Sequence, residues 1–245
     1  MANAAQIERH VLPDPETAAR AVAEWLLERA LAVEGKPALC LAGGNTPRQV
    51  YAMLAQPPFR DRFPWTRAHW FFGDERVVPA DSGRSNYHMV REALFDHVPI
   101  PSANIHPVPT ASGKADQAAA AYEAALKAFY GSERLAANRA LFAATLLGVG
   151  DNGHTASLFP ANPALNERKR WAIGVSDASV PEPRVTLTIP TLESSGEVAF
   201  LVTGATKRDI VSRLGHDDTL PAAMIHPAGR LRWFLDRAAA TNAPR

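Results

Sequence analysis

A histidine in a glycine-rich turn is the side chain in this sequence whose setting best suits acid–base chemistry. His154 follows the glycines of LLGVGDNGHTASLFP (146–160), and we expect it at the start of a short helix. The positive end of a helix disfavours imidazolium, so a histidine there stays neutral and can act as a general base. The alternative is a structural histidine that only caps or hydrogen-bonds the turn.

The same segment matches the Gly-x-Gly-x-x-Gly spacing of dinucleotide-binding turns at Gly148, Gly150 and Gly153. We reject that interpretation, because Pro160 ends any helix after a few residues and a nucleotide-binding crossover needs a longer one. Asp177 is therefore not expected to bind a ribose.

A second glycine turn, LAGGNTP (41–47), is suited to holding an anion. Gly43 and Gly44 let backbone N–H groups approach a ligand, and Pro47 begins a helix whose N-terminus faces the loop. The Thr46 hydroxyl is one more donor. The alternative is an ordinary strand-to-helix turn capped by Asn45 or Thr46.

Three basic residues follow or begin predicted strands and can add positive charge to such a site. Arg76 lies in FFGDERVVP (71–79), Arg184 opens RVTLTI (184–189), and Lys207 follows the strand of LVTGATKRD (201–209). A guanidinium can bind phosphate or carboxylate with two N–H groups. Asp74 and Glu75 can orient Arg76 or do acid–base work. Each basic residue alone can equally be a solvated surface charge.

The elements that must position these residues alternate between short apolar runs and helical patterns. The pattern predicts helices over 18–33, 47–55, 86–95, 114–130 and 205–214, and strands over 38–42, 68–72, 140–150, 171–176, 184–189, 197–204 and 231–236. Continuously apolar strands indicate a mostly parallel sheet buried on both faces. We therefore predict a three-layer α/β fold in one domain, 1–245, with a small excursion around 99–140. Ligands bind at the carboxyl ends of such strands.

Composition excludes several classes of protein. The chain has 245 residues, 47% hydrophobic and 21% charged, with a net charge of +1. These values are those of a globular protein and give no electrostatic case for binding nucleic acid or an anionic membrane. No apolar run approaches the roughly 18 residues of a membrane span, and no signal peptide is visible. With the single cysteine Cys40, this predicts a cytoplasmic protein without disulfides. No metal-ligand or nucleophile-elbow motif is present.

Taken together, the segments resemble the 6-phosphogluconolactonase family. The matching pieces are LAGGNTPRQVY (41–51), FFGDERVVP (71–79), SNYHMVREALFDHVPIPSANIHPV (85–108), LLGVGDNGHTASLFP (146–160), RVTLTIPTL (184–192), FLVTGATKR (200–208) and LPAAMIHPAGRLRWFLD (220–236). The deaminases of glucosamine 6-phosphate share related turns, but we expect a tyrosine in them where this chain has Arg76.

The resemblance implies hydrolysis of 6-phospho-D-glucono-1,5-lactone in the pentose phosphate pathway. It implies a Rossmann-like fold shared with sugar-phosphate deaminases and isomerases, a sugar-phosphate substrate, and neither cofactor nor metal. His154 would be the catalytic base. The substrate site would consist of Gly43, Gly44, Asn45, Thr46, Arg76, Arg184 and Lys207.

The chain departs from the family pattern at two positions. Asn152 stands two residues before the histidine, where an aspartate is usual, and Asn45 replaces a usual serine. Asn152 can orient the imidazole but lacks the charge that stabilises imidazolium, so we count it with His154 as catalytic. Either catalysis tolerates the change, or Asp151 takes over, or the rate is reduced.

Two other functions remain open from the sequence. A sugar-phosphate deaminase or isomerase would use Asp74 or Glu75 as its base. A non-catalytic sugar-phosphate sensor would keep the anion-binding loop without needing His154. We expect a monomer or a small homo-oligomer.

Overall fold

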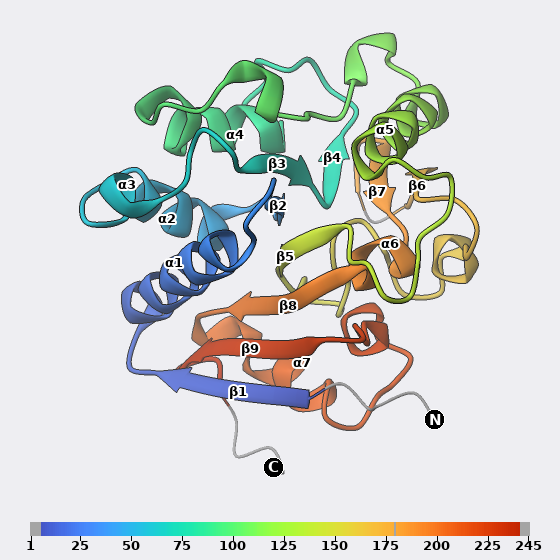
Figure 1. Cartoon of the computed structure of the whole chain (residues 1–245). Helices are drawn as coiled ribbons and strands as arrows, with labels where there is room; N and C mark the ends of the chain where they lie inside the picture. Colours follow the sequence, from blue (N-terminus) through green and yellow to red (C-terminus); the bar gives the residue numbers. More distant parts are fainter. Residues whose placement is uncertain (1–5, 179, 241–245) are drawn as a thin grey trace.

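A six-stranded parallel sheet in the order β1-β9-β8-β5-β2-β3 runs through the computed structural model, which describes residues 6–178 and 180–240 (Figure 1). Every neighbouring pair in it is parallel. The central strands are buried along their length because both faces are covered. The strands are β1 (Gln6–Leu12), β2 (Ala38–Leu41), β3 (His69–Phe72), β5 (Phe142–Leu147), β8 (Ser195–Val202) and β9 (Arg230–Asp236).

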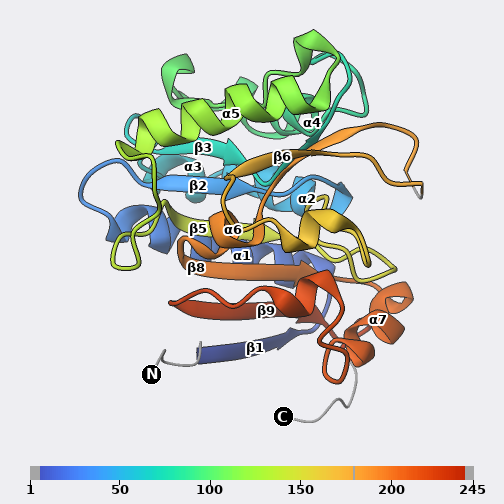
Figure 2. The same ribbon diagram turned by 90° about the vertical axis from the view of Figure 1, so that its right-hand side faces the viewer.

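Helices lie on both faces of this sheet, which confirms the predicted three-layer architecture. In Figure 2, α1 lies behind β5 and β8, and α6 lies in front of them. Asp14 begins α1, since its carboxylate accepts a hydrogen bond from the Thr17 N–H at 2.7 Å. The helices are α1 (Pro15–Ala32), α2 (Asn45–Leu54), α3 (Phe59–Arg62), α4 (Asn86–Ala93), α5 (Ala115–Tyr130), α6 (Ile189–Glu193) and α7 (Arg208–Arg213).

A second sheet corrects the prediction for 171–176 and 184–189. Both segments contain strands, but β6 (Ala172–Val175) and β7 (Arg184–Leu187) pair antiparallel with each other and with β4 (Asp74–Arg76), outside the main sheet. The chain changes partners at Gly73, whose N–H donates to Leu41 O while its carbonyl accepts from Leu187 N. Apolar runs identify strands but not their partners, so the sequence pattern did not separate the two sheets.

The segment predicted as an excursion, 99–140, packs onto the rest of the fold through α5. The Tyr122 hydroxyl donates to Phe72 O at 3.0 Å and accepts from Phe72 N at 2.7 Å, so it ties α5 to the end of β3. Buried hydrophobic side chains from α1, α5 and both sheets form one cluster in the described part of the chain.

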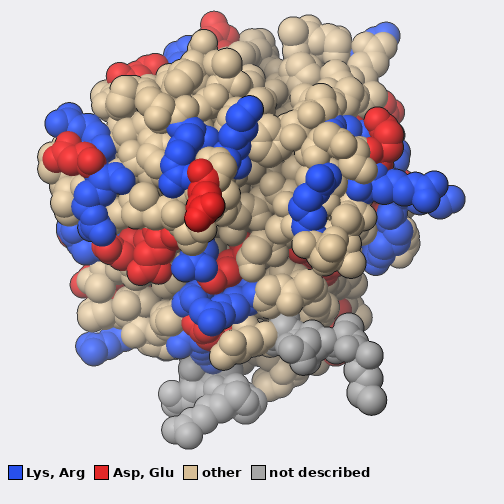
Figure 3. Space-filling view, viewed as in Figure 1, with Lys and Arg blue, Asp and Glu red and all other residues tan. Residues whose placement is uncertain are grey.

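The surface and the helices of the described residues add two observations. On the face drawn in Figure 3, basic and acidic side chains lie interspersed rather than in a patch of one sign. No described helix is long and apolar enough to cross a membrane.

Three of the four predicted strand exits meet at one end of the main sheet, whereas the fourth, residues 203–207 after β8, does not line the cavity there. The segments after β2, β3 and β5 supply Gly43, Gly73 and Gly148 to one cavity, because parallel strands direct their carboxyl ends to the same edge. This arrangement positions the site described next.

Candidate active site

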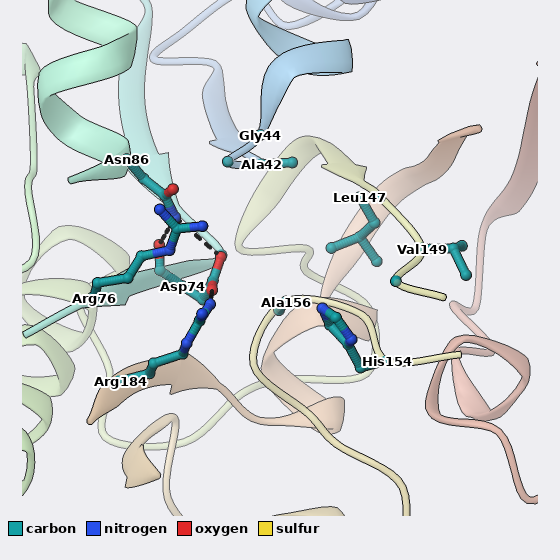
Figure 4. A pocket seen from close by; sticks show the side chains of 14 residues that line it. Ala42, Gly44, Asp74, Arg76, Asn86, Leu147, Val149, His154, Ala156 and Arg184 are labelled. Atoms are coloured by element: carbon teal, nitrogen blue, oxygen red, sulfur yellow. Dashed lines mark hydrogen bonds and ion pairs between the residues drawn. The ribbon is translucent and has the colours of Figure 1, made fainter. Parts of the chain in front are cut away.

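The cavity at the carboxyl ends of β2, β3 and β5 has a volume of about 190 Å³ and brings together most of the residues predicted from the sequence (Figure 4). Gly43, Gly44, Arg76, His154 and Arg184 all line it. Asp74, Asn86 and Gly150 line it as well. The imidazole and the glycine loop thus border the same space, as the predicted chemistry requires.

His154 does not begin a helix, which corrects the sequence prediction. Residues 154–158 form a tight turn in which Leu158 N donates to Thr155 O at 2.9 Å, and Ala156 takes the left-handed conformation at φ +47. The absence of a helix after Gly153 agrees with our rejection of a dinucleotide site. The neutrality of His154 must then have another cause than a helix N-terminus.

Burial supplies that cause. Burial of the ring lowers the pKa of His154 from its ordinary value, against the carboxylate of Asp74, which raises it, while Arg184 and Lys207 lower it further. A partly buried imidazole loses hydration when it becomes charged, and the nearby Arg184 and Lys207 add to that cost. His154 is therefore held as a neutral imidazole near neutral pH.

Asn152 determines which ring nitrogen carries the proton. Its Oδ1 accepts the His154 backbone N–H at 3.1 Å and lies 2.7 Å from Nδ1 of the ring. An oxygen that accepts from the backbone is an acceptor for Nδ1 too, so Nδ1 bears the hydrogen and Nε2 keeps its lone pair. Nε2 has no hydrogen-bond partner among the described residues, which leaves it available as a base.

Gly150 and Phe159 confine the imidazole ring. A Cβ atom at Gly150 would lie 2.0 Å from Cε1 of His154 and 2.1 Å from Nδ1, so the ring occupies the space that a side chain would take. The ring of Phe159 lies 4.9 Å away, centroid to centroid, at an interplanar angle of 42°. Only a glycine at 150 allows this close approach.

Two guanidinium groups give the cavity a positive wall. Arg184 NH1 lies 3.8 Å from Asp74 Oδ2, and Arg76 NH1 donates to the Arg84 carbonyl at 2.6 Å. The Nε atoms of Arg76 and Arg184 are both buried and have no hydrogen-bond partner. Two guanidinium groups that line one cavity and keep buried N–H groups unused favour an anionic ligand.

The glycine loop lies at the N-terminus of α2 without the predicted side-chain cap. Gly44, at φ +100, holds the N-cap position and no side chain caps the helix. Asn45 is exposed, and the Thr46 hydroxyl lies 3.4 Å from that of Thr203 instead. The first-turn N–H groups of α2 therefore remain unsatisfied by side chains, which suits binding an anion.

Lys207 and Asp151 pair with each other outside the cavity lining. The Lys207 ammonium donates to Val149 O at 2.8 Å and to Asp151 Oδ1 at 2.6 Å. The hydrogen bond from Lys207 lowers the pKa of Asp151. Because Asp151 is paired in this way, the partner of His154 is Asn152 and not Asp151.

Sequence reasoning missed three residues that shape the site. Asn86 was expected only as the first residue of the helix over 86–95, yet it packs against Gly43, where a Cβ would lie 2.0 Å from its Oδ1. Gly150 appeared only as a fingerprint glycine. Ser157, fully buried, donates to Asp74 Oδ2 at 2.6 Å. The motifs contain Asn86 and Ser157 as polar residues, which was the available signal. The sequence did not show which distant residues these two side chains contact.

Known proteins are similar to this chain in both sequence and fold. Residues 13–233 match the family described as glucosamine-6-phosphate isomerases/6-phosphogluconolactonase. The chain is 42% identical to a 6-phosphogluconolactonase of Synechocystis sp., over 88% of each chain. It is 36% identical to that of Mycobacterium tuberculosis, over 96% of this chain and 97% of the other. The structure of 6-phosphogluconolactonase from Thermotoga maritima superposes with a TM-score of 0.80 at 30% identity, covering 95% of this chain and 100% of that one.

Proposed function

The chain belongs to the glucosamine-6-phosphate isomerases/6-phosphogluconolactonase family, and we propose that His154 is the general base of its lactonase reaction. The chain hydrolyses 6-phospho-D-glucono-1,5-lactone to 6-phosphogluconate in the pentose phosphate pathway, as its relatives' names indicate at 36–42% identity. The observation that carries the His154 proposal is the contact of 2.7 Å between Nδ1 and the Oδ1 atom of Asn152, from which we infer that Nδ1 bears the hydrogen and that the lone pair of Nε2 is free in the cavity.

The reaction needs one proton to move twice. Nε2 of His154 takes a proton from a water molecule while the water oxygen bonds to the lactone carbonyl carbon. The tetrahedral oxyanion then collapses, the bond from carbon to the ring oxygen breaks, and the imidazolium returns its proton to that oxygen. The product is the open-chain acid, and His154 is again neutral.

The oxyanion and the phosphate both need donors, and the cavity offers two groups of them. N–H groups of a glycine turn, or the guanidinium of Arg76, stabilise the developing negative charge on the carbonyl oxygen. The loop of Gly43, Gly44, Asn45 and Thr46, together with Arg184, binds the phosphate, and Lys207, just outside the lining, adds positive charge to the site. That remote dianion orients the lactone, so part of its binding free energy is used at the reacting carbon.

The geometry of the site argues against two alternative functions. A deaminase or isomerase would need Asp74 or Glu75 as base, but Asp74 already accepts from Ser157 and Asn86. Glu75 is buried and accepts four hydrogen bonds, from Arg76, Ser85, Asn86 and Tyr87. A sensor would not need the oriented lone pair of His154. We further propose a monomer or small homo-oligomer in the cytoplasm, where a lone, buried Cys40 stays reduced.

The test follows the loss of freshly prepared 6-phosphogluconolactone above its spontaneous rate. His154→Ala should lose about 10²–10⁴-fold in kcat, the usual contribution of general base catalysis, and keep its affinity for 6-phosphogluconate. His97→Ala, at an exposed histidine outside the cavity, is the control and should match the wild type. Near-normal turnover in His154→Ala would overturn the mechanism, and ammonia release from glucosamine 6-phosphate would favour a deaminase.

A further inference from the structure

The buried carboxylate of Asp74 touches three different parts of the site. Its Oδ2 accepts from Ser157 Oγ at 2.6 Å and lies 3.8 Å from Arg184 NH1. Its Oδ1 accepts from Asn86 Nδ2 at 3.3 Å, and its carbonyl oxygen accepts from the same amide at 3.0 Å. Asp74 is only 7% exposed, so these contacts form away from bulk water.

The first of these parts is the turn that carries His154. Ser157 lies three residues after the histidine, is fully buried and is not part of the cavity lining. Besides its bond to Asp74, its backbone N–H donates to Thr186 Oγ1 at 3.2 Å. On the other side of Ala156, Thr155 Oγ1 donates to Gly148 O at 2.9 Å. Hydrogen bonds thus hold the turn to the end of β5 through Thr155 and to the sheet of β4, β6 and β7 through Ser157.

The left-handed backbone of Ala156 explains why this turn needs fastening. A non-glycine residue at φ +47 is strained and persists only where its surroundings hold it. The hydroxyl of Ser157 is the contact that joins this strained turn to a charged group, and hydrogen bonds to charged groups are the stronger ones.

The other two parts are the cationic wall and the glycine loop. Arg184 faces Asp74 Oδ2, so the carboxylate fixes the guanidinium that the proposed function assigns to phosphate. Asn86 donates to Asp74 and packs directly on Gly43, where no Cβ would fit. One side chain therefore sets where base, cation and loop lie relative to one another (Figure 4).

We propose that Asp74 is a positioning residue of the lactonase, acting through Ser157 on the His154 turn and through Arg184 and Asn86 on the phosphate site. The proposal rests on the proposed function of His154. It assigns Asp74 no proton transfer, because its carboxylate already accepts from Ser157 and Asn86 and faces the guanidinium of Arg184. Its consequence is that a residue outside the cavity, Ser157, contributes to turnover.

Ser157→Ala is the decisive variant, because Ser157 cannot touch a substrate in the cavity. Freed from Asp74, the turn lets Nε2 move relative to the lactone, and a displacement of this kind lowers kcat by about 10–100-fold. Because Arg184 and Asn86 keep their contacts to Asp74, KM and the Kd for 6-phosphogluconate should stay within about 2-fold, below the loss expected for a ligand contact. A merely structural serine would show no such split between kcat and Kd.

Ser195→Ala is the matched control. Ser195 is also a buried serine with side-chain hydrogen bonds, to Thr145 at 2.8 Å and Leu192 O at 2.7 Å, but it begins β8 at the opposite end of the sheet. It should lose thermal stability and keep kcat. If Ser157→Ala does not fold, Thr186→Val removes the acceptor of the Ser157 N–H and should lower kcat in the same direction.

Asp74→Asn separates positioning from direct chemistry. Its amide oxygen still accepts from Ser157, so part of the turnover should remain, while loss of the ion pair leaves the Arg184 guanidinium less well positioned and raises the Kd for 6-phosphogluconate. Wild-type kcat in folded Ser157→Ala, or complete inactivity of Asp74→Asn beside unaffected Ser157→Ala, would overturn the proposal. The function itself is judged separately, by wild-type turnover and its loss in His154→Ala.

Discussion

The Oδ1 atom of Asn152 accepts two hydrogen bonds from His154, one from the backbone N–H at 3.1 Å and one from Nδ1 at 2.7 Å. This neutral acceptor fixes the ring and its tautomer without adding a negative charge. Burial is the first cause of the lowered pKa of His154. At Nδ1 the imidazolium gains only the dipole of a neutral amide to offset that effect. The base of this site is oriented as in a carboxylate–histidine pair but is less basic.

The first prediction is that Asn152→Asp raises the pKa of His154. A carboxylate at Nδ1 stabilises imidazolium, and because position 152 is exposed and screened we expect a modest rise in the pKa of His154. The neutral base is present above its pKa, so activity is lost as pH falls through it. The acid limb of kcat/KM, which we place below pH 6.5 in the wild type, should move to higher pH in this variant.

Asn152→Ala is the control for that shift. It removes the orientation without adding charge, so kcat should fall while the acid limb stays at or below its wild-type position. A pH–rate profile of kcat/KM for the three proteins distinguishes the cases. An unmoved limb in Asn152→Asp would show that this side chain does not govern the base.

The second prediction concerns the space that Gly150 leaves for the imidazole. In Gly150→Ala the new Cβ would lie 2.0 Å from Cε1, so the ring must move. The backbone at 150 is not left-handed, so an alanine is tolerated there and the effect is on the ring alone. We expect kcat to fall by about 10²-fold, as for an ångström-scale misplacement of a reacting group.

Gly148→Ala is the matched control for this substitution. Gly148 lines the same cavity, but a Cβ there meets no heavy atom within 4 Å. The methyl group of Gly148→Ala enters open cavity space and leaves the ring in place, so in steady-state kinetics it should raise KM and keep kcat near the wild-type value, whereas Gly150→Ala should lose kcat. Equal losses in the two variants would mean that the cavity, and not the ring position, is what the extra methyl disturbs.

His154 and Gly150 also show what the sequence can and cannot predict. The strand exits after β2, β3 and β5 were predictable, because parallel strands must direct them to one edge, and His154 was found by its glycine setting. The role of Gly150 was not predictable, because its contact depends on how the chain turns back to bring the His154 ring, four residues later, against it. The separate sheet of β4, β6 and β7 was missed since pairing is a long-range choice.

The edge strand β1 shows a different limit. Its sequence, QIERHVL, carries charges and exposed apolar residues, so it lacks the buried run that revealed the central strands. It is a strand because β9 offers a parallel partner along its whole length. Tertiary pairing overrides local preference at such edges. Likewise, the residue after Gly153 was expected in a helix, but the hydroxyl contacts of Thr155 and Ser157 hold a turn instead.

The third prediction is that Arg76 contacts the ligand. Its Nε is buried without a partner at the cavity wall, so a ligand anion is the group that would satisfy it. Arg76→Ala should weaken binding of 6-phosphogluconate by about 1.5–3 kcal/mol, the range for hydrogen bonds to charged groups. Isothermal titration calorimetry measures this directly.

Arg84→Ala is the companion variant. The Arg84 side chain pairs with Glu182, whereas its carbonyl, which alanine retains, is what accepts from Arg76. The Kd for 6-phosphogluconate should therefore stay near the wild-type value. If Arg76→Ala also left Kd unchanged, Arg76 would not be a ligand contact, and its place in the cavity would be structural.

The fourth prediction concerns the acid stability of the fold and involves two histidines outside the site. His69 Nδ1 lies 2.9 Å from His106 Nε2, and Phe71 stacks on the His106 ring at 4.2 Å. Burial, and then the neighbouring His69, lowers the pKa of His106 to about 4, and burial also lowers that of His69. The folded state therefore keeps this pair neutral at pH values where the unfolded chain is protonated.

The sign of the pH dependence follows from that difference. Both histidines are neutral in both states above about pH 6.5, their ordinary pKa, so they add no pH dependence there. Between pH 6.5 and about 4 the unfolded state binds protons that the folded state does not, so the free energy of unfolding decreases as pH falls.

His106→Gln keeps a side-chain amide for His69 but cannot titrate, so its free energy of unfolding should fall less steeply over this window. Urea unfolding at several pH values measures the slope, with His97→Gln, at an exposed histidine, expected to follow the wild type. Parallel slopes for His106→Gln and the wild type would contradict the assignment, because carboxylates titrate equally in both proteins and only the buried pair differs.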